Sequence, residues 1–225
     1  MLIWSVALLG LGVTLTSQGA LFSGTYTFST GNNDVPAASS AITFGAFTTT
    51  GVTADTWSSA TQQYGASGWG TTFGNYVSFI LTPSPAVSGY SLTTLGFDVT
   101  AITKMLAGAG NGEWEIWNSG GTSAAASGTF ALPDNGTTSH VDASVNFAFD
   151  NAITIRFYGL ASNAGKDSDM AFDNVLVGGV SPVPEPVDVA LGIFAGTFAV
   201  GGLVRHQRVR RLFSRGIGLL RVPAR

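Results

Sequence analysis

The chain has 225 residues, enough for one domain of ordinary size with appendages, and only 10% of them are charged. Its 30 glycines and many serines and threonines favour an all-β extracellular domain over a helical cytosolic enzyme. The chain has no cysteine, which excludes disulfides, thiolate metal sites and a cysteine nucleophile.

The net charge of −3 conceals two parts of opposite charge. Residues 20–186 carry twelve acidic and three basic side chains, a net charge of −9, whereas seven arginines follow residue 204. Nucleic-acid binding depends on lysine and arginine neutralising phosphates, so we expect no nucleic-acid partner for the acidic part.

The first segment, residues 1–19, has the composition of a signal peptide. An apolar stretch covers residues 2–15, and the small residues Ser17 and Gly19 suit cleavage by signal peptidase after Gly19. We therefore expect export through the Sec translocon and removal of residues 1–19. The alternative is an uncleaved anchor or a buried strand, although the apolar stretch is short for a membrane span.

Residues 20–182 predict a single β-sandwich of the jelly-roll or lectin-like type. Short runs of alternating apolar residues are separated by Gly, Asn, Asp or Pro, and no convincing helical period is present. The expected strands are 22–28, 42–46, 76–81, 90–92, 95–99, 113–117, 129–132, 141–149, 153–158 and 170–177.

Residues 50–75 differ, because Thr, Ser, Gly, Ala and Gln dominate them and aromatic residues punctuate them. We predict a long loop or a loop pair here. Its rings Trp57, Tyr64 and Trp69, together with Trp117, are candidates for glycan binding. The alternative, which we favour for the loop, is that these rings close one end of the sandwich as part of the core.

The string Glu113–Trp117 is the most enzyme-like part of the chain. In a strand, Glu113, Glu115 and Trp117 share one face, and the two carboxylates lie about 6.5–7 Å apart along it. Such a pair could serve glycoside hydrolysis, and the string resembles the Glu-x-Asp-x-x-Glu strand of sandwich-fold glucanases without its third carboxylate. We favour a half-buried strand with solvated glutamates, and we expect no enzymatic activity.

Asp167, Asp169 and Asp173 are weak candidates for binding Ca²⁺, a cation that takes six to eight oxygen ligands. Asp173 could equally hydrogen-bond to a neighbouring turn. We expect no other cofactor.

His140 is the only histidine between residues 20 and 186. A Ser-His-Asp triad would have to use it with Asp134 or Asp142, but the sequence holds no nucleophile-elbow motif. We therefore expect a solvated histidine in a turn.

The C-terminal region, residues 183–225, has three parts in a fixed order. Val183, Pro184, Glu185 and Pro186 come first, and the prolines force an extended backbone. Residues 187–204 follow as an apolar run that would span about 27 Å as a helix, close to a bilayer core. An arginine cluster, Arg205, Arg208, Arg210 and Arg211, then predicts a cytoplasmic end by the positive-inside rule. Residues 212–225 form the remaining basic tail.

This order resembles the C-terminal sorting signal of PEP-CTERM proteins, which are exported bacterial proteins processed by exosortase. The resemblance implies that residues 183–211 form the signal, with Val183–Pro186 as the motif recognised outside the inner membrane. It also implies removal of the helix and of the basic tail. Family members usually end soon after the arginines, whereas this chain continues to Arg225.

The segments 153–159 and 170–177 are similar to those of domains that precede this signal and that look like lectin or carbohydrate-binding jelly rolls. The resemblance implies a cell-surface or extracellular-matrix protein that is structural or adhesive and is associated with exopolysaccharide, as in a biofilm. Three alternatives stay open: a secreted glycoside hydrolase that uses Glu113 and Glu115, a lectin-like glycan-binding module, and a membrane-anchored sensor.

Overall fold

The computed structural model describes residues 20–31, 35–39, 41–55, 62–84, 89–163 and 168–181, which form β-strands, turns and loops and contain no α-helix. The predicted signal peptide (1–19) and the predicted sorting motif, apolar span, arginine cluster and tail (183–225) lie outside these ranges. Within the described ranges, no helix has the length and apolarity needed to cross a bilayer.

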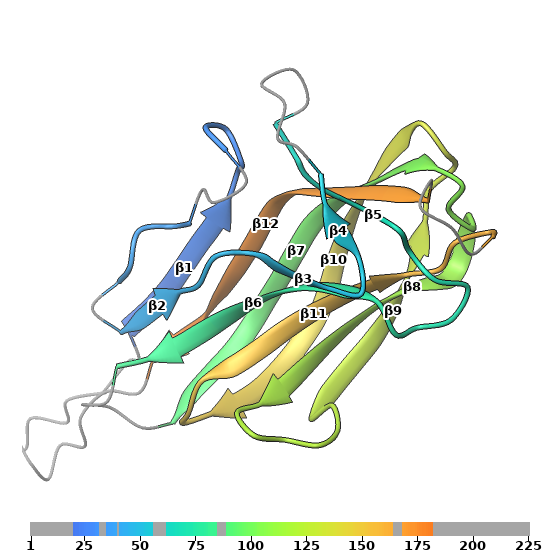
Figure 1. Cartoon of the computed structure of the whole chain (residues 1–225). Coiled ribbons are helices and arrows are strands. Elements are labelled where there is room, and N and C mark those ends of the chain that lie inside the picture. Colours follow the sequence, from blue (N-terminus) through green and yellow to red (C-terminus); the bar gives the residue numbers. More distant parts are fainter. Residues whose placement is uncertain are drawn as a thin grey trace, which may run out of the picture. The chain divides into compact units, whose positions relative to one another are not determined.

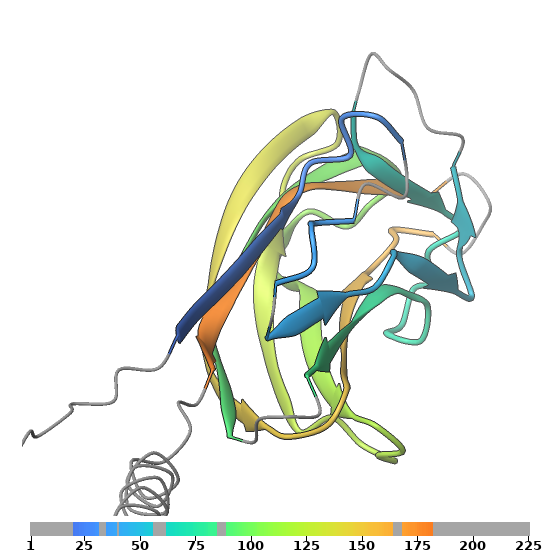
Figure 2. The ribbon, with the colours of Figure 1, turned by 90° about the vertical axis from the view of Figure 1, so that its left-hand side faces the viewer.

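Two antiparallel sheets pack face to face, as Figures 1 and 2 show, which confirms the predicted all-β sandwich. In sheet A the order is β10 (Thr137–Phe149), β7 (Tyr90–Thr103), β12 (Asp169–Ser181), β5 (Tyr64–Ser67) and β4 (Thr53–Ala54), and β1 (Ala20–Tyr26) also pairs with β12. In sheet B the order is β2 (Ile42–Phe44), β6 (Tyr76–Pro83), β11 (Ile153–Gly159), β8 (Gly108–Asn118) and β9 (Ala126–Leu132), and β3 (Thr48–Thr50) also pairs with β6.

Alternating side chains build the core between the sheets. Along β11, Ile153, Ile155 and Phe157 are buried, whereas Thr154 and Arg156 face outward and are half-exposed. The centre of the core is a cluster of aromatic rings in edge-to-face, tilted and stacked contacts, formed by Tyr26, Phe28, Phe47, Phe79, Phe97, Phe157 and Phe172.

The hairpin β8–β9 uses glycine opposite each large ring. Trp114 pairs with Gly128 and Phe130 pairs with Gly112. A Cβ at position 128 would lie 2.6 Å from the Trp114 ring, and one at position 112 would lie 2.2 Å from the Phe130 ring. Each ring therefore lies on the bare backbone of the opposite strand, which holds β8 in place.

The structure corrects two of the expected elements. The predicted loop 50–75 contains β4 and β5, and β5 pairs with residues 169–172 of β12. The two segments expected within residues 90–99 are one 14-residue strand, β7. The sequence concealed both features, because β5 is short and glycine-containing, and because the exposed Thr93 and Thr94 interrupt the alternation in β7.

Candidate functional site

The outer face of sheet B carries an aromatic and charged cluster drawn from three neighbouring strands. Trp114 and Ile116 of β8 are buried in the core, so Glu113, Glu115 and Trp117 point away from it and are half-exposed. This confirms the predicted division of the strand into two faces. We call the cluster of Tyr76, Glu113, Glu115, Trp117, Arg156 and Tyr158 the outer-face cluster.

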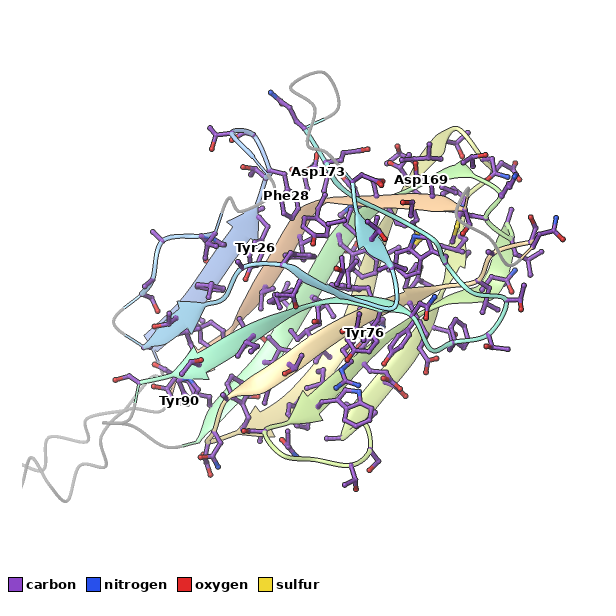
Figure 3. The ribbon with its side chains drawn as sticks, viewed as in Figure 1. Tyr26, Phe28, Tyr76, Tyr90, Asp169 and Asp173 are labelled. Carbon is purple, nitrogen blue, oxygen red and sulfur yellow. The ribbon has the colours of Figure 1, made fainter. Side chains whose placement is uncertain are left out.

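Arg156 is the centre of this cluster. Its guanidinium carbon lies 3.9 Å from the ring centroid of Trp117 on β8 and 4.5 Å from that of Tyr76 on β6. The strand order explains the arrangement, since β11 lies between β6 and β8. Both contacts are cation–π interactions, which a planar guanidinium makes well. Figure 3 labels Tyr76 on its strand.

Glu115 orients two of the rings. Its Oε2 accepts hydrogen bonds from Trp117 Nε1 at 2.7 Å and from the Tyr158 hydroxyl at 2.5 Å. Burial, with the hydrogen bond to Glu115 next in size, raises the pKa of the Tyr158 hydroxyl, so this hydroxyl stays protonated and donates. Glu115 therefore fixes the Trp117 indole from its edge, while Arg156 covers one of its faces.

Glu113 has a different environment from Glu115. Burial, and then the charge of Glu115, raises the pKa of the Glu113 carboxyl above its ordinary value. The Tyr158 ring is buried, and it packs against Tyr76 at 5.3 Å and the exposed Phe73 at 6.2 Å between centroids, so it supports the cluster without adding to its exposed surface.

Of the four aromatic residues predicted to bind glycan, Trp117 alone is described at the surface. Tyr64 is buried among Phe28 and Phe47, and Trp69 is fully buried with its Nε1 donating to the Ala66 carbonyl at 2.6 Å. Neither ring can stack on a glycan. Both belong to the core, which was the favoured prediction for the aromatic residues of this segment. Trp57 lies outside the described residues.

Sequence reasoning missed Tyr76, Arg156 and Tyr158 as members of the site. The alternation of residues 153–158 could have placed Arg156 on the outer face, because Ile153, Ile155 and Phe157 occupy the inner one. Nothing local in the sequence shows that the neighbours of Arg156 on the adjacent strands carry aromatic rings.

The two described calcium candidates belong to separate acidic pairs on sheet A (Figure 3). Asp169 and Asp173 lie four residues apart on β12, about 13 Å along a strand. Asp173 faces Asp98 in the strand register. Burial, and then the hydrogen bond and charge of Asp55, raises the pKa of Asp169 to about 7.

One ion could not be bound by both Asp169 and Asp173 at that separation. Across the described ranges, no three His, Cys, Asp or Glu side chains gather as metal ligands would. Asp167, the third candidate, lies outside those ranges.

His140 lies in strand β10, not in a turn as predicted. Its Nδ1 is 2.6 Å from Asp98 Oδ1, and its Nε2 is 3.2 Å from Asp142 Oδ1. The hydrogen bond to Asp98, which outweighs desolvation, and that to Asp142 raise the pKa of His140. Asp134 belongs to the turn before β10, where its carbonyl accepts a hydrogen bond from the Thr137 amide.

No family model matches the chain, and no curated protein matches it. Among solved structures, it is similar to a family 4 carbohydrate-binding module (14% identity, 58% of this chain and 92% of the other, TM-score 0.36). It is also similar to a family 29 carbohydrate-binding module from Piromyces equi (10% identity, 71% of this chain and 91% of the other, TM-score 0.35). A third similar structure is a xylan-binding family 86 module from Roseburia intestinalis (16% identity, 72% of this chain and 96% of the other, TM-score 0.34). These similarities are too distant to carry an argument about a ligand.

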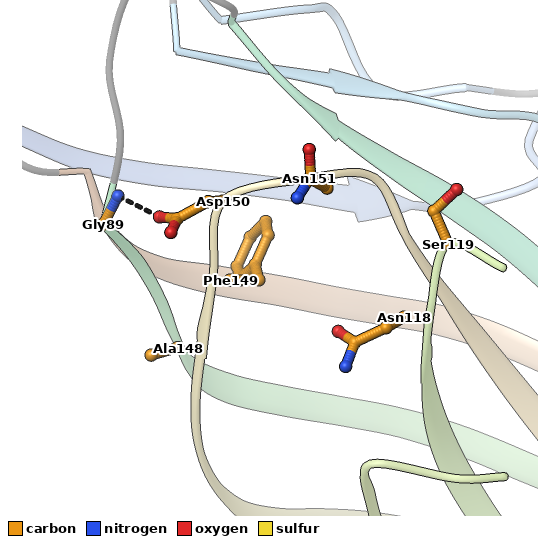
Figure 4. A pocket seen from close by; sticks show the side chains of 7 residues that line it. All are labelled: Gly89, Asn118, Ser119, Ala148, Phe149, Asp150 and Asn151. Atoms are coloured by element: carbon orange, nitrogen blue, oxygen red, sulfur yellow. Dashed lines mark hydrogen bonds between the residues drawn. The ribbon is translucent and has the colours of Figure 1, made fainter. Parts of the chain in front are cut away.

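A separate cavity of about 660 Å³ opens at one end of the sandwich (Figure 4). The Gly89 amide, directly before β7, donates a hydrogen bond to Asp150 Oδ1 in the turn between β10 and β11. This bond ties two walls of the cavity together. Its lining consists of Gly89, Asn118, Ser119, Ala148, Phe149, Asp150 and Asn151.

Proposed function

We propose that this chain is an exported, non-enzymatic glycan-binding module with a lectin-like jelly-roll domain, and that the outer-face cluster binds the glycan. The observation that carries the proposal is the Tyr76–Arg156–Trp117 stack beside Glu115 on the solvent-facing side of sheet B. It combines fixed aromatic rings with charged hydrogen-bonding groups in a single surface.

The chemistry of the cluster suits a sugar chain. Aromatic rings offer apolar surface to the C–H faces of sugar rings, and carboxylate and guanidinium groups bond with sugar hydroxyls. Because the rings are held by Arg156 and Glu115 before any ligand arrives, binding needs little ordering of side chains. The net charge of −9 over residues 20–186 disfavours strongly anionic glycans.

We further propose that the chain is exported through the Sec translocon and held in the inner membrane by residues 187–204 until exosortase acts at Val183–Pro186. The support is the order of motif, apolar run and arginine cluster in the sequence. The mature protein would then be a structural or adhesive component of the cell surface or matrix, associated with exopolysaccharide. The intact mass of the protein from cells with and without exosortase tests this route.

Binding of the full-length protein to a panel of immobilised polysaccharides tests glycan recognition. The protein should be kept in a detergent without a sugar headgroup, so that the detergent does not compete. Trp117→Ala should lower binding at least tenfold, whereas Leu176→Ala on the far sheet should leave it unchanged. Equal retention by wild type and Trp117→Ala would refute the outer-face cluster as the binding surface.

One observation favours hydrolysis as a second candidate function. Burial, and then the charge of Glu115, raises the pKa of Glu113, as for a general acid, and Glu115 offers a second carboxyl group two residues along the same face of β8. Release of reducing sugar from the same panel, abolished in both Glu113→Gln and Glu115→Gln, would establish this activity. We expect no release of reducing sugar, because the hydrogen bonds by which Glu115 positions Trp117 and Tyr158 explain its place in the cluster without a catalytic role.

A further inference from the structure

The cavity at the end of the sandwich is a second candidate site, with a lining of its own. Its volume of about 660 Å³ lies within the range of roughly 300–1,000 Å³ that is typical of small-molecule sites. Side chains from two separate parts of the fold line it: Asn118 ends β8 and Ser119 follows it, and Asp150 and Asn151 lie between β10 and β11 (Figure 4).

The lining defines the class of ligand. Asn118 and Asn151 each offer an amide donor and a carbonyl acceptor, Ser119 offers a hydroxyl, and Asp150 offers carboxylate oxygens. Among the described lining residues none is basic, so nothing there would neutralise a phosphate, a sulfate or a uronate. A neutral compound with several hydroxyls, which both donate and accept, matches this inventory best.

The cavity is distinct from the outer-face cluster, although Trp117 and Asn118 are adjacent in sequence. Successive side chains of a strand point to opposite faces of its sheet. Trp117 points away from the core with Glu115, so Asn118 projects to the other side at the strand end. Phe149 also lines the cavity, and it is a buried core residue of sheet A.

We propose that this cavity binds a single neutral sugar residue, such as the exposed end of a glycan chain, independently of the outer-face cluster. A chain crossing the outer face and a chain end held in the cavity would then be bound by one domain. Two sites of this kind would let the protein link glycan chains together.

Saturation-transfer NMR on the full-length protein tests the proposal, with D-glucose, D-galactose, D-mannose and N-acetyl-D-glucosamine as separate probes. At least one sugar should receive saturation from the wild-type protein. The double variant Asn118→Ala/Asn151→Ala should lose that transfer. Ser119→Trp, which introduces an indole at an exposed position of the lining, should lose it as well. Trp117→Ala should retain it.

Absence of transfer to all four sugars, or transfer that both cavity variants retain, would overturn the proposal. Loss of transfer in Trp117→Ala would do so too, because it would assign the sugar to the outer face. The polysaccharide panel tests the outer-face cluster separately. The cavity proposal can therefore fail while the proposed function stands, and the two failures are distinguishable. Circular dichroism of each variant shows whether it is folded, and the two cavity variants change different residues.

Discussion

The guanidinium of Arg156 lies over the ring of Trp117, 3.9 Å from its centroid, and joins the middle strand of sheet B to its neighbour. On its other side the same group lies over Tyr76. Because Arg156 lies between the two rings, it fixes the positions of both Tyr76 and Trp117 on the solvent-facing side of sheet B.

Replacing Arg156 should therefore change stability as well as the surface. Arg156→Ala removes two cation–π contacts of about 0.5–1 kcal/mol each at an exposed site, so we expect a loss of about 1–2 kcal/mol in the free energy of unfolding. Arg156→Lys keeps the charge but not the planar guanidinium, so its free energy of unfolding should fall by less than that of Arg156→Ala. Urea unfolding of wild type, Arg156→Ala and Arg156→Lys measures these losses in the free energy of unfolding. An Arg156→Ala variant as stable as wild type would contradict the stacked arrangement.

Gly128 should not tolerate a methyl group. A Cβ there would lie 2.6 Å from the Trp114 ring, so Gly128→Ala should destabilise by about 1–3 kcal/mol through overpacking. Gly74→Ala is the matched control, because a Cβ at that position meets nothing within 4 Å. Thermal unfolding should show a lower Tm for the first variant and a nearly unchanged one for the second.

Two buried tyrosines should respond in opposite ways to loss of the hydroxyl. The Tyr26 hydroxyl donates to the Gly45 carbonyl at 2.7 Å, and Tyr26→Phe leaves that carbonyl without this donor, at a cost of about 1–3 kcal/mol. Among the described residues the buried Tyr90 hydroxyl has no hydrogen-bond partner, so Tyr90→Phe should be neutral or stabilising. Denaturant titration that gave equal losses for both would contradict the assigned hydrogen bonding.

Asp169 should make stability depend on pH. Its pKa is about 7 in the folded protein and 3.8 as an ordinary aspartate, so between these values the folded state binds more protons than the unfolded state. The free energy of unfolding should therefore fall as the pH rises from about 4 to about 7. His140, whose pKa is also raised, acts in the same direction.

Asp55→Asn separates the contribution of Asp169 from the others. Without the neighbouring carboxyl, the pKa of Asp169 should move toward its ordinary value, and the fall in stability should become shallower. Asp134→Asn, in the exposed turn before β10, is the control and should keep the wild-type slope. Urea unfolding at about pH 4.5, 6 and 7.5 gives the three slopes, and parallel curves for wild type and Asp55→Asn would rule out the coupling.

The alternation of apolar residues was sufficient to predict the sandwich and most of its strands. In β8 it also predicted the inward Trp114 and the outward Trp117 correctly, because a buried face imposes a period of two. It failed for β5, a four-residue strand whose side chains are mostly buried, and for His140, whose edge strand is largely exposed.

The candidate site could be predicted only in part. The outward direction of Glu113, Glu115 and Trp117 follows from local periodicity. The approach of Tyr76 and Arg156 depends on β6, β11 and β8 lying side by side, and strand order and register are long-range properties. The burial of Tyr64 and Trp69 has the same origin, since contacts from distant strands cover both rings.

The indole resonance of Trp117 tests the central claim most directly. The chain has five tryptophans, so ¹⁵N-tryptophan labelling of the full-length protein gives a simple spectrum that single Trp→Phe variants can assign. Titration with whichever neutral polysaccharide the panel selects should shift the Trp117 Nε1–H signal in a saturable way and leave that of the buried Trp69 unchanged. A polysaccharide that binds without moving the Trp117 signal, or a panel in which none binds, would contradict the account.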